Sequence, residues 1–166
     1  MRVGELSALK HTDICLEKQF IHVQRTEVTY KDPTTSERVC EVQDFPKTQA
    51  GDRYLIIPET AISILKEIMG ISEGNEYLFS ENGKRIRANA FNRRLTRVCD
   101  DLKIKHRSMH KIRKTYGTTL LDADVDKSIV AEQMGHKDIS TTIRFYYRGN
   151  KSDSTKISQI NKALSC

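Results

Sequence analysis

The stretch SMHKIRKTYGTTLLDADVDKSIVAEQMGHKDISTTIRFYY, residues 108–147, carries most of the side chains that point to a function. It contains a His-x-x-Arg pair, a histidine directly after a glycine, and two adjacent tyrosines: His110, Arg113, His136, Tyr146 and Tyr147. Arginine neutralises a phosphodiester, histidine moves protons, and tyrosine supplies a nucleophilic hydroxyl. Taken singly, each of these residues is also typical of an ordinary surface or core position.

This stretch is predicted to be helical. Its pattern predicts helices over 109–123 and 127–134, with Gly135 as the C′ residue of the second. Asp138 or Ser140 is expected to cap a further helix that runs to the tyrosines.

His110 and Arg113 are three residues apart, so on a helix both project from one face and can meet a single small anion. His22 and Arg25 have the same spacing. They fall in a predicted strand, however, where residues i and i+3 point to opposite faces. The helical context therefore separates the two pairs, although the helical pair by itself is more typical of a surface feature than of a site.

Residues 20–57 predict a small antiparallel meander. Strands are expected over 20–30, 38–45 and 53–57, from their β-branched and aromatic content, with turn-forming residues between them. Lys47 would lie at or near the tip of the second turn, from which a side chain can reach into a cleft. A solvated lysine is the commoner occupant of such a tip.

The remaining segments predict helices. Pro58 suits a first helical turn, and an apolar stripe follows it up to Gly70. The helix over 89–102 has one apolar face and one basic face; the apolar side chains are Phe91, Leu95, Val98 and Leu102, and the basic ones are Arg93, Arg94 and Arg97. The basic face suits a phosphate backbone and equally an ordinary solvated surface. A last amphipathic helix over 156–164 could pack on its own domain or on a neighbouring protomer.

The chain starts abruptly on a predicted helix, with Leu6 and Leu9 spaced as on one face. Arg2 and Glu5 are three residues apart and can hold each other in place, or can form a plain surface ion pair. Because a domain rarely starts on such a helix, we expect material to precede it.

The composition predicts one ordered globular domain. The 166 residues are 30% charged and carry a net charge of +6, which favours a polyanionic partner. The four cysteines are scattered without a C-x-x-C pair, so free thiols in a reducing compartment are expected, without a zinc site. The sequence contains neither an apolar run of membrane-spanning length nor a signal peptide, so a cytoplasmic protein is expected.

Together these motifs resemble the tyrosine recombinase (phage integrase) family. The resemblance is carried by Arg-Val-Gly-Glu-Leu-x-x-Leu at 2–9, Lys47-Thr48, His110-x-x-Arg113, Gly135-His136, and Ser140-Thr-Thr142 followed by tyrosine. It implies a bacterial, phage or mobile-element protein. The fold class expected is α+β, mainly α-helical: a helical catalytic domain with a small three-stranded antiparallel β-sheet on one edge. The family's core-binding domain, which normally precedes this region, is absent from residues 1–166.

The resemblance also implies roles for individual residues. Arg2 and Arg113 correspond to the arginines that hold the non-bridging oxygens of the scissile phosphate. Lys47 corresponds to the lysine that protonates the leaving 5′-oxygen. His110 would assist proton transfer, and His136 would hydrogen-bond the phosphate. Glu5 would brace the site.

Tyr146 is the expected nucleophile. Family members place it nine or ten residues after the histidine of the Gly-His pair. Here the position nine residues on is Phe145, which has no hydroxyl, whereas Tyr146 is ten on. Tyr147 is held in reserve, since the two tyrosines are about 100° apart on a helix and cannot share one pose.

The implied reaction is a transesterification of double-stranded DNA through a 3′-phosphotyrosyl intermediate, with no cofactor and no metal. The implied partner besides DNA is the chain itself: a monomer when free that assembles into a tetrameric synapse on DNA. The alternatives are a non-catalytic DNA-binding fragment, a type IB topoisomerase, and a helix-turn-helix regulator, the last of which would leave Lys47 and the tyrosines unexplained.

Overall fold

The computed structural model describes residues 1–44, 51–138 and 140–142, together with 154, 157 and 161. Lys47, Tyr146 and Tyr147 lie outside the described residues, as does most of the predicted helix over 156–164.

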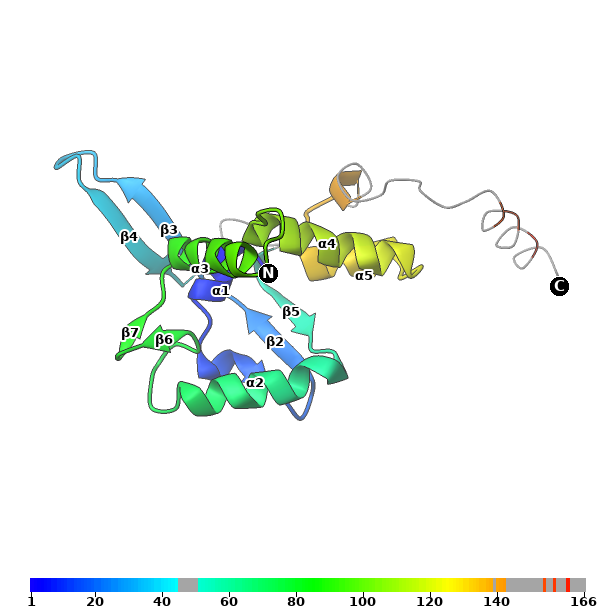
Figure 1. Cartoon of the computed structure of the whole chain (residues 1–166), viewed down its shortest axis with the longest axis horizontal. Helices are drawn as coiled ribbons and strands as arrows, with labels where there is room; N and C mark the ends of the chain where they lie inside the picture. Colours follow the sequence, from blue (N-terminus) through cyan, green and yellow to red (C-terminus); the bar gives the residue numbers. More distant parts are fainter. Residues whose placement is uncertain (45–50, 139, 143–153, 155–156, 158–160, 162–166) are drawn as a thin grey trace.

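Short helices and strands alternate in the first half of the chain and helices dominate the second (Figure 1). In the first half the elements are α1 (Val3–Ser7), the 3-10 helix η1 (His11–Asp13), β1 (Ile14–Cys15), β2 (Phe20–Val23), β3 (Thr26–Lys31), β4 (Arg38–Gln43), β5 (Arg53–Ile56) and α2 (Glu59–Ile71). In the second they are β6 (Ser80–Glu81), β7 (Lys84–Arg85), α3 (Ala88–Asp101), α4 (Met109–Asp122) and α5 (Lys127–Met134).

The expected fold class is confirmed, but the predicted meander is wrong. A three-stranded antiparallel sheet exists in the order β1-β2-β5, while β3 and β4 form a separate two-stranded hairpin. That hairpin projects away from the rest of the molecule (Figure 1). The strand predicted over 20–30 is interrupted because Gln24 and Arg25 both donate to the buried carboxylate of Asp13, at 2.8 and 2.7 Å.

The predicted helices are confirmed to within two residues at most ends. α5 ends as expected, with Gly135 in the left-handed region at φ 62°. α2 continues through Gly70 to Ile71, although Gly70 was expected to stop it. In α3 the apolar face was partly misassigned, since Val98 and Leu102 are 49% and 63% exposed and Cys99 is buried instead. The buried side of α3 is the one that packs against α1 and α4.

Two sets of contacts hold α5 in place. Leu121 of α4 packs with Val130 and Met134 of α5 in the buried core. Gln133 joins α5 to the edge strand β5, because its side-chain oxygen accepts from the backbone N–H of Ile56 at 3.0 Å and its amide donates to the Tyr54 carbonyl at 3.3 Å. The end of α5 is therefore held beside β5.

Candidate active site

The last turn of α5 is the point at which distant parts of the chain meet. Three successive carbonyls accept hydrogen bonds from three arginines: Gln133 from Arg53 Nε at 3.3 Å, Met134 from Arg113, and Gly135 from Arg2 Nη2 at 3.0 Å. The final carbonyls of a helix lack partners within the helix and carry its partial negative charge. Guanidinium groups from the N-terminus, β5 and α4 supply those partners here.

Arg2 is oriented from two sides. Its Nη1 contacts Glu5 Oε1 at 2.8 Å, and its backbone N–H donates to Glu5 Oε2 at 2.6 Å. The Glu5 side chain is only 4% exposed, whereas that of Arg2 is 48% exposed. The pair is therefore anchored on a buried carboxylate and is not the plain surface ion pair that the spacing also allowed.

Arg53 completes the cluster, and the sequence did not single it out. Its guanidinium binds Glu5 through Nη2 at 2.9 Å and Nη1 at 3.2 Å, and both side chains of this ion pair are buried. The available signal was the alternation of β5, which puts Arg53 on the same inward face as Leu55. A charged residue on an inward face requires a buried partner.

The carboxyl of Glu5 remains ionised in this setting. Burial opposes ionisation, but the hydrogen bonds and charge of Arg53, with the hydrogen bonds from Arg2, lower its pKa to about 2. Glu5 is thus an anion at neutral pH that orients two arginines.

His136 follows directly after these carbonyls. Its Nδ1 lies 2.7 Å from the hydroxyl of Thr142, which is fully buried. Partial burial and the positive charges of Arg113, Arg2 and Arg53 lower the pKa of His136 from 6.5 to about 4. At neutral pH the ring is therefore uncharged in an electropositive surrounding.

The two members of the His-x-x-Arg pair differ in exposure. Arg113 is 7% exposed and is held against the end of α5, while His110, one turn earlier on α4, is exposed. The side chain of His110 makes no hydrogen bond or ion pair to any residue that the structure describes.

Beyond the cluster, Arg2 and Arg113 also line a cavity of about 400 Å³ whose other walls are mainly apolar side chains of β5, α2 and α4. A phosphate in this cavity would lose its hydration shell and gain few hydrogen-bond donors in return, so the cluster around the end of α5 suits an oxyanion better.

In the described part of the chain, no group of three or more acidic, histidine or cysteine side chains could hold a metal ion. None of the described helices could cross a membrane.

The structure therefore brings Arg2, Arg113 and His136 together, with Glu5 behind them. Lys47 belongs to the segment 45–50, which lies outside the described residues. The described chain resumes at Gly51, whose carbonyl accepts from Arg53 Nη1 at 3.0 Å.

The structure has a cluster of guanidinium groups and a histidine at this helix end, in a helical fold with a small sheet. Comparison of the chain with known protein families agrees with this arrangement. The chain belongs to the phage integrase family, whose sequence model matches residues 1–153.

Similar proteins occur in bacteria and phages. The chain is 31% identical to a tyrosine recombinase XerC-like protein of Caldanaerobacter subterraneus subsp. tengcongensis, over 88% of this chain and 42% of that protein. It is 25% identical to the integrase of Staphylococcus phage L54a, over 88% of this chain and 44% of that protein. The chain thus spans less than half the length of these two relatives.

Solved structures share the fold. The Tn1549 transposon integrase in complex with transposon right end DNA has a TM-score of 0.79 at 21% identity, covering 100% of this chain and 55% of that one. The XerA recombinase has a TM-score of 0.70 at 22% identity, covering 99% and 54%.

Proposed function

We propose that residues 1–166 act as the catalytic domain of a site-specific DNA recombinase. The observation that carries this proposal is the convergence of Arg2, Arg53 and Arg113 on three successive carbonyls next to His136. Positive charge held around one helix end stabilises a phosphodiester and its pentacoordinate transition state. Membership of the phage integrase family supports the same reaction class.

Arg2 is the group that grips the scissile phosphate. Its bonds to Glu5 and Gly135 fix the plane of the guanidinium, while half of its side chain faces solvent. A guanidinium has five N–H donors, so two side-chain bonds leave donors for phosphate oxygens. Arg113, which is buried, supplies a second positive charge from the interior of the protein.

His136 binds the phosphate as a neutral ring. His136 Nδ1 lies 2.7 Å from the Thr142 hydroxyl. We assign the hydroxyl as the donor to Nδ1, which puts the ring proton on Nε2, where it can be donated to a phosphate oxygen. A phosphate in the site opposes the field of the arginines, so DNA binding raises the pKa of His136 above its value of about 4 in the free protein.

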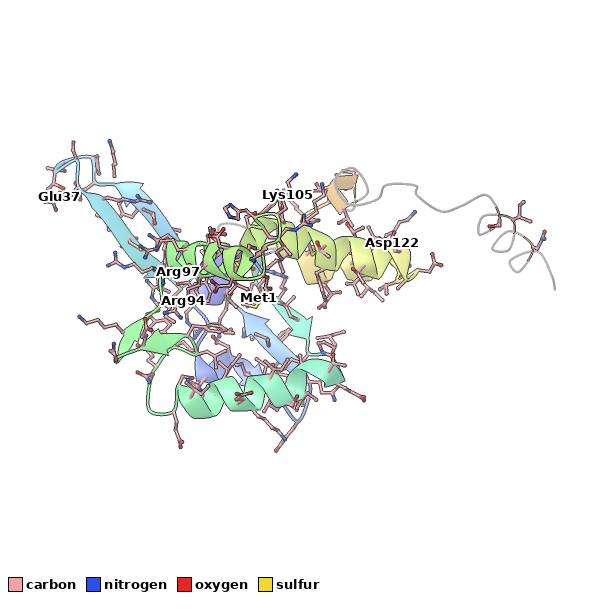
Figure 2. All side chains as sticks on the ribbon, in the orientation of Figure 1. Met1, Glu37, Arg94, Arg97, Lys105 and Asp122 are labelled. Carbon is pink, nitrogen blue, oxygen red and sulfur yellow. The ribbon has the colours of Figure 1, made fainter. Side chains whose placement is uncertain are left out.

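Tyr146 attacks the phosphorus. Its phenolate displaces the 5′-oxygen, which Lys47 protonates with assistance from His110, and a 3′-phosphotyrosyl bond stores the energy of the broken linkage. A 5′-hydroxyl of another strand then attacks that bond, releases Tyr146 and joins the strands. The exposed arginines of α3, of which Arg94 and Arg97 are labelled in Figure 2, contact the DNA backbone. The chain is a monomer when free and assembles as a tetramer on DNA.

Capture of the covalent intermediate tests this function. Nicked duplexes, with randomised sequence around the nick, release a short product after cleavage and so trap the phosphotyrosyl adduct. The expected result is an adduct that survives denaturant, forms with Tyr147→Phe, and is lost with Tyr146→Phe.

A different dependence on the two tyrosines contradicts parts of the proposal. Loss of the adduct with Tyr147→Phe alone would identify the other tyrosine as the nucleophile. Absence of an adduct with the wild-type chain, together with DNA binding that weakens steeply with salt, would leave a non-catalytic DNA-binding domain.

A further inference from the structure

Arg53 is fully engaged inside the protein. Its side chain is 4% exposed, and its three nitrogens donate to Glu5, to the Gly51 carbonyl and to the Gln133 carbonyl. A guanidinium so placed does not reach a DNA phosphate at the surface. Any effect of Arg53 on the reaction must therefore act through the residues that it holds.

Glu5 is the first of these residues, because it is shared with Arg2. Its Oε1 contacts Nη1 of both arginines, at 2.8 Å for Arg2 and 3.2 Å for Arg53. Its Oε2 accepts from the backbone N–H of Arg2 and from Arg53 Nη2. Each arginine therefore binds both carboxylate oxygens, and the position of Arg2 depends on a carboxylate that Arg53 fixes from the buried side.

Gly135 is the second residue that Arg53 holds. A Cβ placed on Gly135 would lie 2.8 Å from the Cζ of Arg53, so the guanidinium packs directly on this backbone. The carbonyl of the same residue accepts from Arg2 at 3.0 Å. Both supports of Arg2 are thus in contact with Arg53.

We propose that Arg53 is a positioning residue that sets the orientation of Arg2 toward the scissile phosphate, through Glu5 and Gly135. This inference rests on the proposed function, in which Arg2 grips that phosphate. Arg53 holds the carboxylate ionised and the end of α5 in place, so that Arg2 is oriented before DNA arrives. A preorganised donor needs no rearrangement at the moment of reaction.

Removal of the Arg53 charge has a specific consequence for Glu5. A buried carboxyl that loses a cationic partner binds a proton more readily. Once protonated, Glu5 no longer accepts from both nitrogens of Arg2, and Arg2 loses its orientation. The cleavage rate then depends on the protonation of Glu5, at a higher pH than in the wild-type protein.

The test compares Arg53→Gln with the matched variant Arg25→Gln in the same chain. Arg25 also forms a buried ion pair, with Asp13 at 2.7 Å and side chains 12% and 2% exposed, but among the described residues it makes no hydrogen bond or ion pair to Arg2 or α5. Single-turnover formation of the phosphotyrosyl adduct is measured against pH, on a nicked duplex selected from the randomised pool. Both variants are first checked for cooperative unfolding.

We expect Arg53→Gln to lower the rate about 10–100-fold near neutral pH and to move the acid decline of the rate to higher pH. Addition of Glu5→Gln should remove that decline, and Arg53→Lys should restore the wild-type pH profile with part of the rate. Arg25→Gln should retain the wild-type pH profile. Equal rate losses in Arg53→Gln and Arg25→Gln, with unchanged pH profiles, would overturn the proposal.

A second measurement is independent of catalysis. Titration with inorganic phosphate, followed by the NMR signals of the His136 ring, should show at least fivefold weaker binding in Arg53→Gln than in the wild type and Arg25→Gln. Equal affinities would overturn the role of Arg53. If the wild-type chain forms no adduct, the proposed function fails, whereas the phosphate titration still decides on Arg53.

Discussion

Two buried carboxylates on neighbouring elements, α1 and β3, are used differently in this fold. Glu27 of β3 and Glu5 of α1 have side chains that are both 4% exposed, and arginines lower the pKa of both. Glu27 accepts from Arg85, from the Ser7 hydroxyl at 2.8 Å, and from the first backbone N–H of α3, at Ala88. Its arginine is 14% exposed, whereas Arg2, one of the two partners of Glu5, is 48% exposed.

The exposure of the cation separates the scaffold from the site. In the Glu27 network every charged group is enclosed, so the network joins α1, β3, β7 and α3 and offers little to a ligand. In the Glu5 network one guanidinium is enclosed and the other is presented to solvent. The same chemistry thus stabilises the fold in one place and orients a donor in the other.

The largest expected effect is the loss of the Glu27 network. Glu27→Ala leaves Arg85 buried without its carboxylate and the start of α3 without its acceptor, which should cost about 3–5 kcal/mol of unfolding free energy in urea. Glu81→Ala removes the exposed pair with Arg94, 2.7 Å apart, and should cost less than about 1 kcal/mol. Similar losses in the two variants would contradict the assignment of Glu27 to the scaffold.

Two left-handed glycines sharpen the comparison at the site. Gly135→Ala requires an alanine at φ 62° and brings its Cβ within 2.8 Å of the Arg53 guanidinium, so we expect a loss of about 2–4 kcal/mol in stability. Gly74 has φ 80°, and a Cβ placed on it would meet no atom within 4 Å, so Gly74→Ala should cost only the backbone strain of about 1–2 kcal/mol.

The functional readout of these variants should differ more than their stability. Gly135→Ala displaces Arg53 and should also slow adduct formation, while Gly74→Ala should not. Equal stability losses with equal adduct rates would show that Arg53 accommodates the added methyl group.

Sequence reasoning found the elements of the second half of the chain because each is encoded locally. Ser108 and Asp126 cap α4 and α5, and Gly135 ends α5 in the left-handed region. Motif order likewise pointed to Arg2, Arg113 and His136. The strand pairing was missed because the interruption at Arg25 depends on Asp13, which lies outside the predicted strand, 12 residues before Arg25. Arg53 was missed for the same reason, since its partners Glu5 and Gln133 lie 48 and 80 residues away.

The smallest expected effect is on the pH dependence of stability, in which the buried carboxylates and His136 contribute over different pH ranges. A carboxyl whose pKa is lowered on folding stabilises the fold above its unfolded pKa of 4.5, and that stability is lost as the pH falls toward the folded pKa. The stabilisation by Glu5 and Glu27 is therefore lost only below pH 4.5. His136 acts in a separate window. Its pKa falls from 6.5 to about 4 on folding, so the unfolded chain binds the extra proton in that range and stability is lost as pH drops from 6.5 toward 4.

His136→Gln should therefore flatten the pH dependence of the unfolding free energy between pH 6.5 and 4.5, by about 1–2 kcal/mol after allowance for partial solvent screening. The exposed His106 provides a control variant, His106→Gln, for the loss of one histidine. Urea unfolding at several pH values measures the slope. A slope in His136→Gln equal to that of the wild type would mean that neither burial nor the arginines lower the pKa of this ring, and the site would lose the electropositive character that sets it apart from the Glu27 network.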